Sequence, residues 1–280
     1  RCRRLLRRGD SLQVTSLASG SSGNALLVQD GSSAVLVDCG LAQRTIEREL
    51  RHLGLEPRNL NAILLTHEHG DHSYSAISFA RRHGLTLVAN QPTIDKLGLL
   101  SAGVAYRVLP TGEQTEIAGM LVRSFPVLHD AADPVGYTIR VGNWCVGVAI
   151  DLGRWDERVY ANLCEADLVV LEANHDRERL RMAPYDWPVK LRIMSDLGHL
   201  DNVQAAELLA RLGADGRRRT AWLAHMSEQA NSPRIALDVI NTVLAMANVQ
   251  CITLQALPRR APMIWESDQH NRQLELFTLE

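Results

Sequence analysis

The segment 66–72 constrains the fold of this chain more than any other part of the sequence. It reads Thr-His-Glu-His-Gly-Asp-His and follows the apolar run 62–65, which has the composition of a buried strand. A single histidine is more often an ordinary surface or core residue than a ligand. Three histidines and an aspartate at the end of a buried strand, however, leave much buried charge unexplained unless they bind metal. Imidazole and carboxylate ligands without a thiolate favour zinc, manganese or iron.

The His-x-His-x-Asp-His spacing offers ligands to two cations. His67 and His69 can converge on one cation, while Asp71 and His72 turn toward a second. Further ligands must then come from other strand ends, and any one candidate is compatible with a chance loop position. Together with the first four, the candidates supply seven ligands, enough for two cations that share one carboxylate. The three candidates, each of which ends an apolar run, are His129, Asp151 and His225.

Short β-like runs alternate with amphipathic helical stretches, an order typical of an α/β fold. Strands are expected at 12–16, 24–28, 34–38, 62–66, 85–89, 121–127, 135–141, 144–150, 168–171, 220–224 and 251–256. Helices are expected at 42–53, 74–83, 202–212 and 234–247. No linker or low-complexity segment interrupts the chain, so we expect one domain over 11–267. A basic extension at 1–10 precedes it, and a polar tail at 268–280 follows it.

The composition indicates what kind of protein this is and in which compartment we expect it. A chain of 280 residues with 46% hydrophobic content is ample for a core. It contains no apolar run near 18 residues, so we expect no membrane partner. Five scattered cysteines favour reduced thiols in the cytoplasm over a disulfide framework. A net charge of −2 does not by itself indicate a nucleic-acid binder, although bound divalent cations would add positive charge that this count omits.

The order His-x-His-x-Asp-His, His, Asp, His over about 12–256 resembles the metallo-β-lactamase superfamily. The resemblance implies a four-layer αβ/βα sandwich that binds two divalent metal ions, Zn²⁺ or Mn²⁺. It also implies that Asp38 matches the family's first characteristic acid, which supports the ligands through hydrogen bonds. Carried over residue by residue, the first cation is held by His67, His69 and His129, the second by Asp71, His72 and His225, and Asp151 bridges the two. This fold hosts hydrolysis of lactams, thioesters, lactones and phosphodiesters, so the reaction needs further evidence.

Other segments are similar to the YycJ/WalJ/VicX branch of that superfamily, whose members are regarded as 5′-to-3′ exodeoxyribonucleases. They are the Ser/Gly-rich run 16–24, the Gly-His-Leu-Asp-Asn run 198–202, and the run 224–227 with Asn231. The branch usually has Ser-Asn where this chain has Asp201 and Asn202, and Lys-Glu-Asn-Asn where it has 228–231. These departures leave the metal ligands untouched but put the substrate contacts in doubt. The resemblance implies DNA as the substrate and a role in DNA repair or metabolism.

The run Leu-Glu-Ala-Asn at 171–174 resembles the His-Glu-Ala-Thr motif of tRNase Z, a phosphodiesterase of the same fold. This resemblance implies that His199 donates a proton and that Glu172 orients it. The chemistry agrees, because a leaving 3′-oxygen needs a proton and a carboxylate raises the pKa of a histidine toward neutrality. Alternatively, His199 caps a turn before the helix at 202–212. In the catalytic interpretation, Asp71 binds one cation and orients the attacking water.

Substrate contacts are predicted more weakly. Ser21, Ser22 and Asn24 lie in a loop whose small residues let backbone N–H groups approach a phosphate, although such loops are commonly just tight turns. Lys190 and Arg192 alternate with apolar residues, and they either lie on a solvated face or contact the DNA backbone. The branch motif adds two further candidates, Ser227 and Asn231.

Competing functions differ in class. A lactonase or thioesterase is the alternative enzyme, but no helical domain with basic substrate anchors follows residue 256. The segment between Asp151 and His225 is too short for the large insertion of RNA-processing β-CASP nucleases. The segment between His72 and His129 leaves little room for the flexible arm of tRNase Z. A non-enzymatic DNA-repair adaptor, in which the metals only stabilise the fold, agrees poorly with the ligand pattern, because structural metal sites are usually closed and mononuclear.

The segment 273–277 resembles the Gln-Leu-x-Leu-Phe peptide by which bacterial repair proteins dock on the DNA sliding clamp. Leu274, Leu276 and Phe277 would enter an apolar groove, while Gln273 satisfies polar groups at its edge. Alternatively, these residues form a last strand or helical turn packed on the domain.

Overall fold

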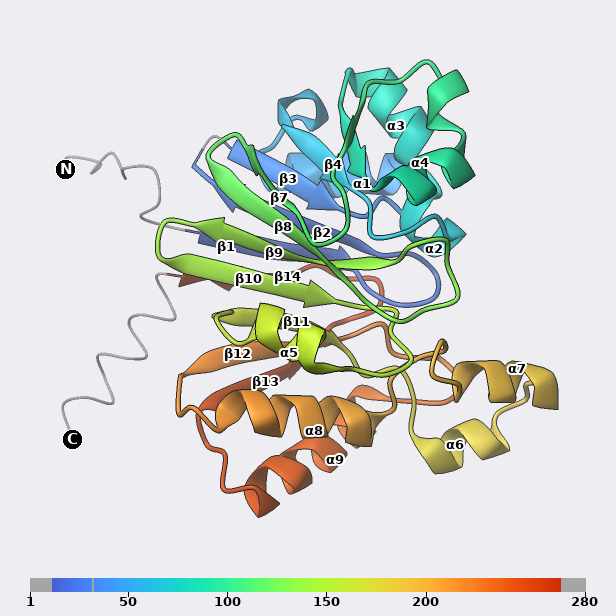
Figure 1. Cartoon of the computed structure of the whole chain (residues 1–280), viewed down its shortest axis with the longest axis vertical. Coiled ribbons are helices and arrows are strands. Elements are labelled where there is room, and N and C mark those ends of the chain that lie inside the picture. The colour runs from blue at the N-terminus through green and yellow to red at the C-terminus, as the bar shows by residue number, and fades with distance from the viewer. Residues whose placement is uncertain (1–11, 32, 268–280) are drawn as a thin grey trace.

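The computed structural model describes residues 12–31 and 33–267, which form two facing sheets enclosed by helices (Figure 1). The predictions for the extension 1–10, the tail 268–280 and the clamp motif 273–277 fall outside the described residues and stay predictions. Within the described part of the chain, no helix is both long and apolar enough to cross a membrane.

The first sheet has seven strands in these residues, in the order β14-β1-β2-β3-β4-β5-β6. Its antiparallel half contains β14, β1, β2 and β3, and its parallel half runs from β3 to β6. The strands are β1 (Leu12–Ala18), β2 (Ala25–Asp30), β3 (Ser33–Val37), β4 (Ala62–Leu64), β5 (Leu87–Ala89), β6 (Tyr106–Val108) and β14 (Met263–Glu266).

The second sheet repeats this plan over the described residues, in the order β13-β12-β11-β10-β9-β8-β7. Strands β7 to β10 pair antiparallel, and β10 to β13 pair parallel. The strands are β7 (Gln114–Ile117), β8 (Met120–Pro126), β9 (Val135–Val141), β10 (Trp144–Ala149), β11 (Leu168–Glu172), β12 (Arg219–Ala224) and β13 (Ile252–Ala256).

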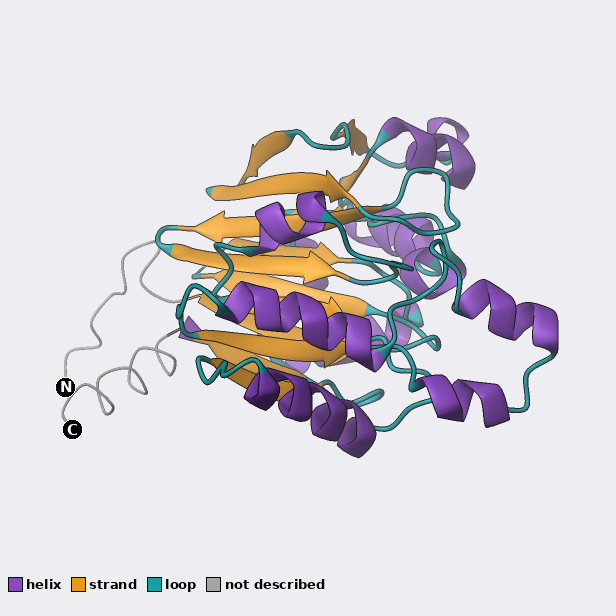
Figure 2. Ribbon diagram, turned by 60° about the horizontal axis from the view of Figure 1, so that its bottom comes forward, coloured by secondary structure: helices purple, strands orange, loops and turns teal. Residues whose placement is uncertain are grey.

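The helices form the outer layers. Helices α1, α3 and α4 bury apolar residues against the first sheet, and α5, α8 and α9 do so against the second (Figure 2). The remaining helices lie in the connecting loops. The bounds are α1 (Gln43–His52), η1 (Pro57–Asn59), α2 (Gly70–Ser73), α3 (Ala76–His83), α4 (Gln91–Leu97), η2 (Leu99–Ser101), α5 (Glu157–Leu163), α6 (Arg177–Met182), α7 (Trp187–Ile193), α8 (Asn202–Gly213) and α9 (Pro233–Met246).

The largest apolar cluster lies between the two sheets and includes the fully buried Tyr137, Ile139 and Trp222. Separate clusters lie between each sheet and its own helices. Helix, sheet, sheet and helix therefore follow one another as four layers, each interface closed by apolar side chains. This is the αβ/βα sandwich that the sequence predicts.

Every strand predicted from the sequence is present, with each end shifted by at most two residues. The prediction missed the edge strands β6, β7 and β14 and the helices α4, α5, α6 and α7. The helix expected at 74–83 is present as α3 and begins two residues later, at Ala76, after the short helix α2 ends at Ser73.

Candidate active site

The site lies at one edge of the sandwich, where the carboxyl ends of strands from both sheets meet. Segment 66–72 follows β4, and the other candidate ligands follow β8, β10 and β12. Asp38, Asp151 and His225 take left-handed backbone conformations, with φ of 62°, 56° and 50°. Such a residue costs about 1–3 kcal/mol of strain and persists mostly at functional sites, where it aims a side chain.

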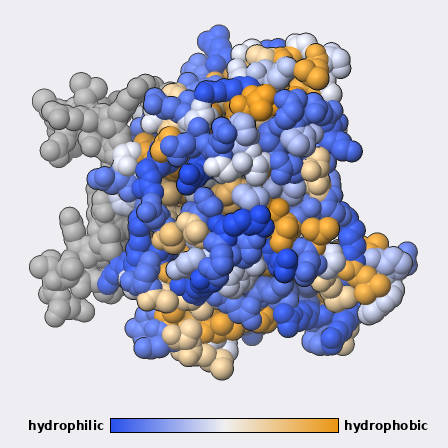
Figure 3. Space-filling view, in the orientation of Figure 1, coloured by the Kyte–Doolittle hydropathy of each residue, from blue (hydrophilic) through white to orange (hydrophobic). Residues whose placement is uncertain are grey.

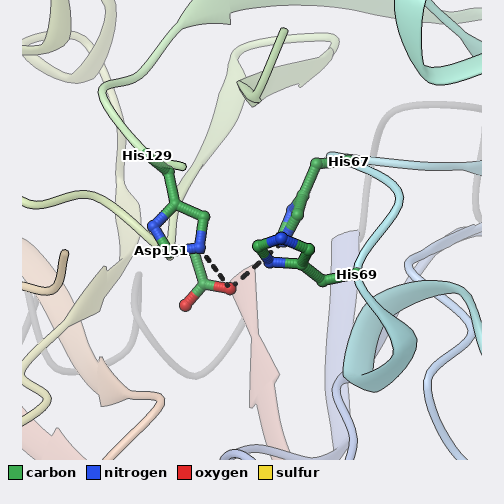
Figure 4. Close-up of side chains that lie close together, drawn as sticks. All are labelled: His67, His69, His129 and Asp151. Carbon is green, nitrogen blue, oxygen red and sulfur yellow. Dashed lines mark ion pairs between the residues drawn. The ribbon is translucent and has the colours of Figure 1, made fainter. Parts of the chain in front are cut away.

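The structure brings His67, His69, His129 and Asp151 together in what we call cluster 1 (Figure 4). One potential ligand atom of each residue lies within 4.8 Å of those of the others. Asp151 Oδ2 is 3.4 Å from His67 Nε2 and 3.9 Å from His129 Nε2. Residues from three separate loops therefore converge on one point.

Cluster 2 contains Asp71, His72, His225 and again Asp151, within the same 4.8 Å limit. His72 Nε2 lies 2.8 Å from Asp151 Oδ2, and His225 Nε2 lies 3.3 Å from Asp71 Oδ2. Asp151 is thus shared by both clusters. A third overlapping group, which also meets the distance limit, combines Asp151, Glu172, His199 and His225.

Hydrogen bonds behind the rings fix which nitrogen faces the site. His72 Nδ1 lies 2.7 Å from Asp38 Oδ2, His129 Nδ1 lies 2.9 Å from the Gly198 carbonyl, and His225 Nδ1 lies 2.9 Å from Glu172 Oε1. These acceptors hold the proton on Nδ1 and leave Nε2 as the potential ligand atom. Asp38 therefore lies behind the ring of His72, which is the side that the family resemblance implies for it.

The residues present fit divalent cations. Among the described residues, the buried atoms His67 Nε2 and Asp151 Oδ1 have no hydrogen-bond partner. Asp151 Oδ1 lies 2.7 Å from His225 Nδ1, but the hydrogen bond of that nitrogen goes to Glu172. Burying carboxylates and unpaired ring nitrogens is costly unless a cation compensates them. The imidazole and carboxylate donor set is the one that such cations take.

Without a cation, the carboxylates attract protons to the rings. Burial by itself lowers the pKa of His72, but Asp151 and Asp38 outweigh it and raise that pKa to about 10. Burial also lowers the pKa of His225, but the negative charge of Asp151 outweighs burial and raises that pKa well above its usual range. For Asp151, burial favours the neutral acid, yet His225 and His72 hold its pKa well below the usual value.

Metal loading is therefore expected to release protons. At pH 7 the ring of His72, with its pKa raised to about 10, is protonated in the cation-free protein, and the upward shift of the pKa of His225 favours its protonated ring as well. A cation must displace a proton from each ring, so we expect about two protons released and an affinity that falls as pH falls. Titration calorimetry in buffers of different ionisation enthalpy measures the number. Loading without proton release at pH 7 would contradict this arrangement.

A histidine–carboxylate pair stands beside the clusters. His199 Nδ1 lies 2.8 Å from Glu172 Oε1, while Glu172 Oε2 accepts hydrogen bonds from the backbone N–H groups of Leu152 and Leu200 at 2.9 and 3.1 Å. Burial lowers the pKa of His199, but Glu172 and Asp151 outweigh this and raise it to about 9. The structure thus places the predicted proton donor against the predicted orienting acid.

A cavity of about 270 Å³ opens over both clusters, and His199 lines it. Of the predicted substrate contacts, Ser21, Ser227 and Arg192 line this cavity. Ser22 is exposed but does not line it. Arg192 carries an ion pair to Asp130, with Nη2 3.0 Å from Oδ1, so its guanidinium is oriented by a neighbouring carboxylate.

Two predicted substrate contacts are corrected by the structure. Lys190 is only 9% exposed, and its ammonium donates to the backbone carbonyl of Arg181 at 2.6 Å. It therefore lies neither on a solvated face nor in the cavity. Asn231 is buried and donates to the carbonyl of Ala173 at 2.8 Å and to Asn202 Oδ1 at 2.8 Å. Its amide joins two loops by hydrogen bonds, and it does not line the cavity.

Asn24 is corrected in the same way. It is buried, its Oδ1 accepts from the Gly20 N–H at 2.9 Å, and its backbone N–H donates to the Asp71 carbonyl at 2.8 Å. Gly40 completes this junction, because a Cβ there would lie 1.7 Å from the Asp71 carbonyl oxygen. The Ser/Gly-rich run therefore positions the metal loop, and only Ser21 reaches the cavity.

Four residues that line the cavity were not predicted as site residues: Asn174, Tyr185, Val189 and Ile193. Asn174 lies in the Leu-Glu-Ala-Asn run, and its amide donates to the His225 carbonyl at 2.9 Å. The other three belong to the segment 177–193, which carries α6 and α7. Figure 3 shows hydrophobic residues gathered on this projecting segment, several of which are exposed.

Comparison with known proteins identifies the family. The chain matches the family model of the beta-lactamase superfamily domain over residues 33–226. It is 35% identical over 240 residues to exodeoxyribonuclease WalJ of Streptococcus pneumoniae serotype 2, across 83% of this chain and 88% of that protein. It is 34% identical over 236 residues to exodeoxyribonuclease YycJ of Bacillus anthracis, across 83% and 89%.

Solved structures agree on the fold. The metallo-β-lactamase fold protein YhfI of Bacillus subtilis has a TM-score of 0.71 at 16% identity, covering 92% of this chain and 100% of its own. The short form of human tRNase Z has a TM-score of 0.60 at 17% identity, covering 90% and 98%. At these identities the two structures bear on the fold alone. The sandwich, the family match and the identity over most of the chain show that this protein belongs to the metallo-β-lactamase superfamily of metal-dependent hydrolases, in its YycJ-like branch.

Proposed function

We propose that this chain is a two-metal phosphodiesterase that removes nucleotides from a DNA strand in the 5′-to-3′ direction, in DNA repair or metabolism. The observation that carries the proposal is the meeting of two ligand clusters, sharing Asp151, with the His199–Glu172 pair in one cavity. The names of the WalJ and YycJ relatives support DNA as the substrate.

In this proposal each of the two ligand sets holds one cation. His67, His69 and His129 would hold one, Asp71, His72 and His225 the other, and Asp151 would contact both. Zn²⁺ and Mn²⁺ suit these donors. Bound there, the cations would lower the pKa of water and offset charge on the reacting phosphate.

Side chains of the protein would then position the attacking water, the proton donor and the phosphate. The Asp71 side chain is 25% exposed, so its carboxylate reaches the cavity and can accept a hydrogen bond from the attacking water. His199, held through Nδ1 by Glu172, keeps Nε2 free to give a proton to the leaving 3′-oxygen. Arg192 and Ser21 lie where a phosphate of the strand would pass.

Product analysis tests this function. End-labelled single- and double-stranded DNA and RNA of one sequence are incubated with the protein and Mn²⁺ or Zn²⁺. We expect release of mononucleotides from the 5′ end of DNA and weaker action on RNA. Internal fragments would indicate an endonuclease. Hydrolysis of a lactone or thioester with no action on any phosphodiester would favour the small-molecule hydrolase.

A further inference from the structure

A second cavity, of about 220 Å³, lies next to the metal cavity and shares His199 with it. His175, Arg177, Arg181 and Met194 line it. His175 is 2% exposed, and its Nδ1 has no hydrogen-bond partner among the described residues. The reaction at the metal clusters uses none of these four side chains.

We propose that this second cavity binds the 5′-terminal nucleotide of the DNA strand, with its terminal phosphate at Arg181 and Arg177. The inference rests on the proposed function, and it explains why hydrolysis would begin at the 5′ end of the strand. His199 is the group that protonates the leaving 3′-oxygen, so the nucleoside carrying that oxygen must lie beside His199. His199 lines the second cavity, which no residue of cluster 1 or cluster 2 lines.

The size of the cavity limits its occupant. Cavities that hold drug-sized ligands measure roughly 300–1,000 Å³, and this one is smaller at about 220 Å³. A cavity of this size takes no more than about one nucleotide. Burial lowers the pKa of His175 to about 4, so its ring is neutral at pH 7 and offers hydrogen bonding without charge. With the thioether of Met194, it forms a wall suited to a sugar or base.

Charge selects the end of the strand. A terminal phosphate monoester carries about −1.5 to −2 charges at pH 7, more than an internal diester. Arg177 and Arg181 are one turn apart on α6, so they share a face, and their side chains are 55% and 60% exposed. Arg177 Nε lies 2.5 Å from Asp201 Oδ2, which orients the guanidinium. Guanidinium groups bind phosphate through paired N–H donors.

The matched substitutions Arg181→Ala and Arg179→Ala test the inference. Arg179 is exposed on the same helix but does not line the cavity. On oligonucleotides with a 5′-phosphate, Arg181→Ala is expected to lower kcat/KM by about 10- to 100-fold, the worth of a charge-assisted hydrogen bond. On 5′-hydroxyl oligonucleotides it should change little, and Arg179→Ala should leave both substrates unaffected. Equal losses on both substrates, or none, would overturn the inference.

Binding gives a readout that does not depend on nuclease activity. The metal-loaded protein is titrated with a deoxynucleoside 5′-monophosphate and with the matching nucleoside. We expect the monophosphate to bind more tightly, and Arg181→Ala to remove that difference while Arg181→Lys keeps part of it. Arginine-dependent binding without nuclease activity would support the cavity and refute the proposed function. Exonuclease activity with no monophosphate binding would refute the cavity alone.

Discussion

Substitution of Asp151 with asparagine is expected to remove bound metal and hydrolysis together. Asp151 Oδ2 lies 2.8 Å from His72 Nε2 and 3.4 Å from His67 Nε2, so one carboxylate faces both clusters. Groups that merely support metal ligands are worth about 10- to 100-fold in affinity or activity, and a shared ligand is expected to exceed that. Elemental analysis of the purified variant and the rate on a 5′-phosphorylated oligonucleotide measure the two losses.

The choice of asparagine keeps the test free of a folding defect. Asp151 has a φ of 56°, a conformation that asparagine tolerates better than alanine. Asp238→Asn, at an exposed carboxylate of α9, is the matched control and should retain metal and activity. If the Asp151→Asn variant keeps two equivalents of metal, the proposal that Asp151 contacts both cations is refuted.

The convergence of the ligands could be predicted from the sequence, because each follows an apolar strand. In a sheet whose central strands run parallel, the residues after those strands meet at one edge, whatever the rest of the fold does. Asp151 after β10 and His225 after β12 illustrate this, since β11 alone separates their strands. The shared position of Asp151 depended on the family resemblance, which the distances now support.

The missed strands lack a pattern of their own. β6 (Tyr106–Val108) has only exposed residues, and β7 (Gln114–Ile117) is mostly polar. Both lie at sheet edges, so pairing with a neighbour determines them more than side-chain alternation does. No single-sequence periodicity marks such a strand.

Helix α7 shows how a pattern can mislead. Its residues 189–193 alternate apolar and charged in the order Val-Lys-Leu-Arg-Ile, as in a strand, yet they belong to a short helix with proline in its first turn. As a result Lys190 points inward, where its ammonium caps the carbonyl of Arg181 near the end of α6. Arg192, two residues later, reaches the cavity. Tertiary packing, which the sequence pattern does not encode, therefore directs the basic side chains of Lys190 and Arg192 to different surroundings.

Replacement of His199 with alanine is expected to leave both metals bound yet slow DNA hydrolysis by roughly 10²- to 10⁴-fold, the usual worth of a positioned acid. On a nitrophenyl phosphodiester, whose leaving group needs no proton, the loss should be much smaller. Metal content is a necessary readout, because His199 also lies in the third ligand group. His52→Ala, at an exposed histidine of α1, is the control. Loss of metal would make His199 a ligand, and equal loss on both substrates would make it a binding residue.

The pH profile separates these roles further. Burial lowers the pKa of His199 and Glu172 raises it more, to about 9 in the absence of cations, so the ring is protonated at pH 7. The protonated ring is the donor, so the rate should be full below its pKa and fall as pH rises through it. Cations nearby disfavour the charged ring and shift this alkaline limb to lower pH. The limb should disappear in His199→Ala and weaken on the nitrophenyl substrate. An unchanged limb in the variant would assign that titration to another group and remove His199 from proton transfer.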